Sequence, residues 1–177
     1  MMLFGFLLAI LAAVRTAWTG TAAVGEVFSA ADAKSIPGGW IGYAEATANQ
    51  TLTNTATETD LTGLTVTVTV AANRKIRITG QGILSRSVAD GVTVGRIKEG
   101  STELGRWAQH APSATTEFDD AMGSAISSPA GAFVTPSAGS HTYKLTLQRF
   151  SGTGNVTLNA AAGSQAYILV EDLGPAS

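Results

Sequence analysis

The segment Leu64–Val70 alternates strictly between apolar and polar side chains: its even-numbered positions are Leu or Val, and its odd-numbered positions are Thr. Because successive side chains of a β-strand point to opposite faces, this pattern predicts a strand with one buried and one solvated face. The same alternation recurs to the end of the chain. It predicts strands at about 41–47, 62–71, 74–87, 92–98, 102–111, 115–127, 141–150, 155–161 and 165–172.

Turn residues separate these strands. Short connections at 71–73, 99–101 and 151–154 predict three hairpins. The long connection at 129–140 predicts a corner where the chain changes sheets, while Gly80 and Gly82 predict a bend or a tight crossing. The whole pattern predicts an all-β protein, an antiparallel β-sandwich of jelly-roll or immunoglobulin type. The absence of a Cys…Trp…Cys signature favours a jelly-roll-like sandwich.

The last predicted strand is apolar on both faces. Ala166, Ile168 and Val170 share one face, whereas Tyr167 and Leu169 share the other. A strand that is apolar on both faces is covered on both, and a second subunit can supply the outer cover. We therefore expect a homo-oligomer in which Tyr167 and Leu169, or their neighbours Ile168 and Val170, contact another copy.

The first fourteen residues are almost wholly apolar and end at Arg15. As a helix they would span about 21 Å, short of the ~30 Å hydrocarbon core of a membrane. A signal peptide would have a suitable apolar region and a cleavage site at Thr21–Ala23, but no basic residues precede that region. The third alternative is an apolar helix that docks into a partner or into copies of itself. Its candidate attachment residues are Leu3, Phe4, Phe6, Leu7, Leu8, Ile10 and Leu11.

Proline and glycine at 37–39 mark a boundary, so the sequence divides into an attachment tether (1–39) and a sandwich domain (40–177). With 177 residues, 45% of them hydrophobic, the chain is long enough for one domain with a real core. A net charge of −2 argues against nucleic acid as a partner. Seven basic residues nevertheless fall between positions 74 and 106, either as solvated strand faces or as a patch for an anionic partner.

Candidate chemistry is sparse. Neither a catalytic motif nor a cofactor fingerprint accompanies the two histidines, His110 and His141, so we expect no enzyme and no cofactor. Glu117 and Asp119 share a strand face and could bind calcium, or could form a charged strand edge that blocks pairing. A zinc site from the two histidines and a carboxylate would need two distant loops to converge. Nothing in the spacing supports a catalytic site from Asp119, Asp120 and a histidine.

Two tryptophans, Trp40 and Trp107, are candidate glycan contacts, because an aromatic ring can stack on a sugar. The alternative is that both are partly buried core residues. The glycan interpretation, joined to an apolar leader, would fit a secreted bacterial carbohydrate-binding module.

Several segments resemble small virion proteins of tailed phages that infect actinobacteria, described as minor tail, fibre or head-decoration proteins. The segments are Gly25–Asp32, Ile36–Glu45, Asp60–Val68, Pro136–Leu145 and Ala166–Pro175. The resemblance covers about residues 25–175 and implies a β-sandwich displayed on the virion surface, as a trimer, without catalytic residues. Other virion proteins and a host cell-surface glycan are the partners that it suggests. We therefore expect a non-enzymatic virion structural protein, with the secreted carbohydrate-binding module as the alternative.

Overall fold

The computed structural model describes residues 38–53, 56–110, 119–120, 131–161 and 163–176, without the side chains of His110, Asp119 and Asp120. These residues form strands and turns, and no helix among them could span a membrane. The strands are β1 (Gly39–Ala46), β2 (Gln50–Leu52), β3 (Thr59–Val70), β4 (Arg74–Gln81), β5 (Ile83–Arg86), β6 (Thr93–Glu99), β7 (Thr102–His110), β8 (Asp119–Asp120), β9 (Ala132–Val134), β10 (Gly139–Arg149), β11 (Val156–Asn159) and β12 (Ala166–Pro175).

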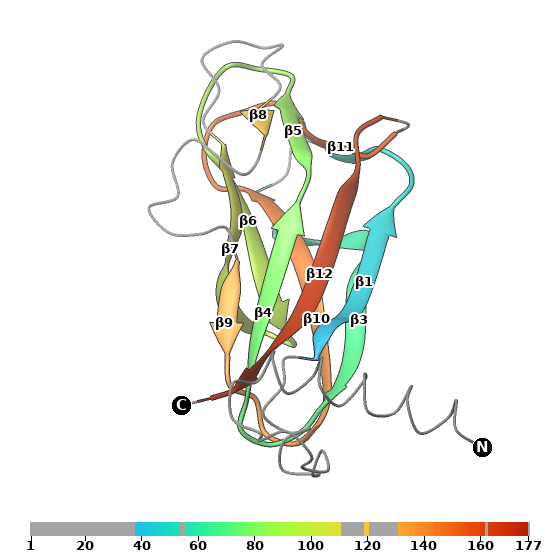
Figure 1. Ribbon diagram of the computed structural model, residues 1–177. Helices are drawn as coiled ribbons and strands as arrows, with labels where there is room; N and C mark the ends of the chain where they lie inside the picture. The colour runs from blue at the N-terminus through green and yellow to red at the C-terminus, as the bar shows by residue number, and fades with distance from the viewer. Residues whose placement is uncertain (1–37, 54–55, 111–118, 121–130, 162, 177) are drawn as a thin grey trace, which may run out of the picture.

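Two four-stranded antiparallel sheets pack face to face (Figure 1). The front sheet has the order β1-β12-β4-β9, and the back sheet has the order β3-β10-β6-β7. If these eight strands are renumbered along the chain, the orders become 1-8-3-6 and 2-7-4-5. This interleaving is the double Greek key of a jelly roll, so the predicted jelly-roll-like sandwich is confirmed.

A third, smaller sheet covers one end of the sandwich. Its order is β2-β11-β5-β8, and each of its strands lies in a connection between the front and back sheets. We call this the cap end; it is uppermost in Figure 1. The opposite end, which we call the base end, holds the start of β1 and the end of β12. The first strand of the jelly roll therefore begins, and its last strand ends, at the base end.

The core lies between the front and back sheets and follows the predicted parity. The apolar side chains at positions 64, 66, 68 and 70 of β3 are at most 7% exposed, whereas the threonines between them are exposed. The apolar residues that share one parity in the other strands are likewise fully buried: Ile76, Ile78, Leu84, Tyr143, Leu145, Leu147, Val156 and Leu158. Alternation therefore assigned the faces of these strands correctly.

Two of the three predicted hairpins are wrong. The β6–β7 hairpin is confirmed by the pairing of Glu99 with Thr102. The turn at 71–73, however, leads from the back sheet to the front sheet, and the turn at 151–154 leads from the back sheet to the cap. A short turn fixes only that two strands follow closely. Here each strand pairs with a partner that is distant in sequence, because this buries the apolar faces of both sheets against each other.

The predicted strand 74–87 is divided at Gly82 into β4 and β5, which belong to different sheets. Of the expected bend or tight crossing, the bend is found at Gly82, whereas Gly80 lies inside β4 where a Cβ atom would lie 2.7 Å from Trp107. The predicted corner at 129–140 is also confirmed, since the chain passes there from β9 in the front sheet to β10 in the back sheet. The short strand β9 itself was not predicted. Of the predicted strand 115–127, only β8 lies within the described residues, and the tether up to residue 37 lies outside them.

Candidate functional site

Most of the exposed aromatic side chains of the described residues lie on the outward side of the front sheet. We define the aromatic face as Trp40, Tyr43, Phe133, Tyr167 and Leu169. Trp40 is 72% exposed, Phe133 48% and Tyr43 47%. Because residues paired across neighbouring strands share a face, the strand register shows how these side chains adjoin: Tyr43 lies opposite Leu169, and Trp40 lies opposite Glu171.

Hydrogen bonds hold the two tyrosines of the aromatic face in place. Their ring centroids lie 5.7 Å apart, with the planes tilted by 34°. The Tyr43 hydroxyl donates to a Glu45 carboxylate oxygen at 2.7 Å, and the Tyr167 hydroxyl donates to the Gln81 amide oxygen at 2.5 Å. The bond to Glu45 raises the pKa of Tyr43 above its usual value, so this hydroxyl stays neutral. The rings are thus fixed and present an apolar surface.

The charges beside the aromatic face compensate each other. Arg77 on β4 pairs with Glu171 on β12 at 2.6 Å, in the row that also holds Trp40 and Phe133. This pair adds no net charge to the row that holds Trp40 and Phe133, whereas the Glu45 carboxylate lies beside Tyr43 on the same face.

The four residues predicted as an oligomer interface divide between the two faces of β12. Ile168 and Val170 are fully buried in the core and cannot reach another subunit. Leu169 and Tyr167 point outward, and Leu169 is only 9% exposed because neighbours on the same face cover it. A single chain therefore covers part of the outer face of β12, and Tyr167 and Leu169 remain the candidate contacts with another copy.

The prediction of Trp107 as a glycan contact is wrong. Its side chain is fully buried between the two sheets, and its indole N–H donates to the Thr146 carbonyl at 3.1 Å. Gly80 and Gly95 make room for the ring, because a Cβ atom at either position would lie within 3 Å of Trp107. Trp40, by contrast, is open to solvent and remains a candidate.

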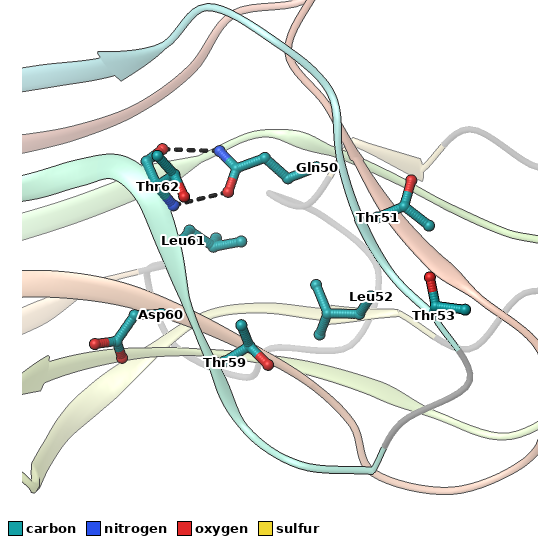
Figure 2. A pocket seen from close by; sticks show the side chains of 8 residues that line it. All are labelled: Gln50, Thr51, Leu52, Thr53, Thr59, Asp60, Leu61 and Thr62. Atoms are coloured by element: carbon teal, nitrogen blue, oxygen red, sulfur yellow. Dashed lines mark hydrogen bonds between the residues drawn. The ribbon is translucent and has the colours of Figure 1, made fainter.

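A groove of about 410 Å³ lies at the cap end between β2 and the start of β3 (Figure 2). The Gln50 side chain reaches across it, donating to the Thr62 carbonyl at 2.8 Å and accepting from the Thr62 N–H at 2.7 Å. Leu52 and Leu61 point toward one another below this bridge. The Gln50 amide therefore takes the place of a neighbouring strand for one residue of β3, which fastens the cap to the back sheet.

The seven clustered basic residues do not form a basic patch. Arg86 is buried rather than solvated, and among the described residues every member except Lys75 has a carboxylate partner. The pairs are Arg74–Asp172, Arg77–Glu171, Arg86–Asp90, Arg96–Glu103, Lys98–Glu58 and Arg106–Glu103. Their charges are therefore largely neutralised within the chain.

Within the described part of the chain, no group of three or more His, Asp or Glu side chains is placed to hold a metal ion. His141 instead bonds to Glu99 and to the Ser137 carbonyl. Glu117 and the side chains of His110, Asp119 and Asp120 lie outside the described residues, as do the attachment residues between positions 3 and 11.

Two members of the aromatic face were missed by sequence reasoning. Tyr43 shares the outward parity of Glu45 in a strand that was predicted, but its exposure depends on pairing with β12, which the pattern does not reveal. Phe133 lies on the unpredicted strand β9. No protein-family model matches this chain, and no curated protein is significantly similar to it.

Proposed function

We propose that this protein is a non-enzymatic structural protein of a phage virion, which displays a jelly roll on the particle surface. The observation that carries the proposal is the aromatic face, an apolar surface on a small domain that also resembles phage virion proteins in sequence. Large exposed apolar surfaces commonly mark sites of protein contact. Jelly rolls are also a recurrent architecture of viral capsid domains.

In this proposal the aromatic face is where copies of the chain meet. Three copies around a threefold axis would shield Trp40, Tyr43 and Tyr167 from water. The balanced pair Arg77–Glu171 avoids the repulsion that a net charge would cause between identical surfaces. A homotrimer would thus cover the outer side of β12, as expected for a strand that is apolar on both faces.

The base end would face the particle and the cap end would project outward. The described chain enters β1 at the base end, so the preceding tether, residues 1–39, would join the sandwich at that end. Bringing three tethers together would strengthen their attachment through effective concentration. The cap end would then be the surface available to a host cell and its glycans.

Mass spectrometry of purified virions tests the assignment to the particle. We expect peptides from this chain in gradient-purified particles, at a ratio to the major capsid protein that stays constant through repeated purification. Loss of the peptides during purification, or their absence throughout, would contradict the proposal.

A secreted carbohydrate-binding module is the second candidate, and the exposure of Trp40 beside Tyr43 favours it. Aromatic rings with an apolar body and a polar edge suit binding of sugar rings. A glycan array with the wild-type chain and Trp40→Ala tests this alternative. Phe150→Ala, which removes an exposed ring outside the aromatic face, is the control. Binding lost only in Trp40→Ala, together with cleavage near Ala23 in the mature protein, would favour secretion.

A further inference from the structure

His141 connects two segments at the base end of the sandwich. Its Nδ1 lies 2.7 Å from a Glu99 carboxylate oxygen, and its Nε2 lies 3.0 Å from the Ser137 carbonyl oxygen. Glu99 ends β6 at the β6–β7 hairpin, whereas Ser137 belongs to the crossover 135–138, which leads from the front sheet to the back sheet. One imidazole therefore bridges the hairpin and the crossover.

Both partners of the ring can only accept hydrogen bonds. A carboxylate and a carbonyl each need an N–H donor, and a neutral imidazole has only one. The imidazolium ion has two and satisfies both partners at once. In the neutral ring, one nitrogen lone pair must face an acceptor oxygen at about 3 Å, so one of the two contacts is lost.

We propose that His141 is a protonation-dependent clamp, which fastens the crossover 135–138 to the β6–β7 hairpin as an imidazolium and releases it when the proton leaves. This inference concerns the fold itself and holds whether or not the protein belongs to a virion. Under the proposed function, the clamp lies at the end that faces the particle.

The groups that surround the His141 ring are mostly uncharged. Its side chain is only 12% exposed, and it stacks on the Tyr143 ring at 6.2 Å with an angle of 11°. Tyr143 is neutral because burial and nearby Glu99 raise its pKa to about 12. The residue of β3 paired with His141 is the apolar Val68. Among the described residues, Glu99 is thus the one charged group that acts on the ring.

The hydrogen bond to Glu99 raises the pKa of His141 above its usual value, burial lowers it, and the Ser137 carbonyl raises it again, with a net upward shift. A group whose pKa is raised on folding stabilises the fold fully below its unfolded pKa, which is about 6.5 for histidine. That contribution is lost as the pH rises through the folded pKa. The clamp is therefore closed in mildly acidic solution and opens toward alkaline pH.

NMR titration of the His141 ring in the full chain, combined with hydrogen exchange of residues 135–139, tests the clamp. We expect a His141 midpoint above 6.5, and amide protection in the crossover that falls several-fold across the same pH range after correction for intrinsic exchange. Glu99→Gln should move the midpoint down and reduce the protection below it, whereas His110→Gln should change neither.

The result that overturns the inference is a His141 midpoint at or below 6.5. Crossover protection that stays constant through the titration would overturn it as well. If Glu99→Gln fails to fold, the wild-type titration and exchange data still decide between these outcomes.

Discussion

Trp107 occupies its place in the core because Gly95 has no side chain. A Cβ atom at position 95 would lie 2.4 Å from the indole Cε2, far inside van der Waals contact. The ring is enclosed on all sides and is held by its bond to Thr146, so it has little freedom to move. A strand glycine that appears uninformative in the sequence is therefore a packing determinant.

We predict that Gly95→Ala destabilises the protein by about 1–3 kcal/mol through overpacking. Chemical denaturation, read by Trp fluorescence or circular dichroism, measures the change. The double variant Gly95→Ala/Trp107→Phe should lose less stability than the sum of the two single variants, because the smaller ring relieves the clash. Additive losses would show that the clash lies elsewhere.

Neighbouring positions 67 and 68 of β3 test the face assignment. Val68 is 5% exposed, so Val68→Asp places an unpaired carboxylate in the core and should cost about 4 kcal/mol or more. The side chain of the exposed Thr67 bonds to the Thr142 hydroxyl at 2.8 Å, so Thr67→Asp should cost about 1 kcal/mol. Equal losses in urea unfolding would mean that the outer side of the back sheet is covered too.

At the scale of elements, one arginine ties two connections together at the cap end. The Arg86 side chain is fully buried at the end of β5 and donates to the carbonyls of Ser151 and Thr153. It also pairs with Asp90 at 3.1 Å, and Asp90 in turn accepts from the Thr153 N–H and hydroxyl. The side-chain bonds of Arg86 thereby join the β5–β6 and β10–β11 connections, in addition to the backbone hydrogen bonds that Phe150 and Ser151 donate to the Val92 carbonyl.

Arg86→Gln should therefore destabilise the protein by about 3 kcal/mol, because the guanidinium is fully buried and its bonds to two carbonyls and to Asp90 are lost. Arg106→Gln is the matched control: its side chain is 47% exposed and pairs with Glu103 at 3.4 Å, so the loss should stay below about 1 kcal/mol. Thermal and urea unfolding measure both. If the two variants are equally stable, the buried network contributes no more than a surface ion pair.

Acid should weaken the same network. Hydrogen bonds from the Thr153 backbone and hydroxyl lower the pKa of Asp90 below its usual value, against a smaller opposing effect of burial. A lowered pKa on folding gives stability that is present above the unfolded pKa and is lost as the pH falls through the folded one. The stability difference between wild type and Asp90→Asn should therefore shrink below about pH 4.

Sequence reasoning predicted the strand faces well and the strand partners poorly. The alternation at 64–70 follows from which side of β3 is buried, and this depends on local parity alone. The turn at 71–73 was interpreted as a hairpin because its length fits one, yet the pairing of β3 with β10 depends on residues about seventy to ninety positions away. The aromatic face is likewise assembled from β1, β9 and β12 by long-range pairing, so only its Trp40, Tyr167 and Leu169 members could be anticipated.

At the scale of the whole molecule, the aromatic face should decide the oligomeric state. We predict that the full chain sediments as a trimer at micromolar concentration, and that Tyr43→Lys, which places a charge among the exposed rings, yields monomers. Phe150→Lys alters a ring that is 63% exposed outside this face and should remain trimeric. A monomeric wild type, or a trimer that persists in Tyr43→Lys, would remove the face from the interface.

Cryo-electron microscopy of the assembled phage particle tests the central claim most directly, because it shows attachment, copy number and exposed surface together. The account predicts jelly-roll density in groups of three on the particle surface. In each group the front sheets should face the threefold axis, the base end should lie against the particle, and the cap end should project outward. Particles without this density, or single copies whose aromatic faces are open to solvent, would contradict the account.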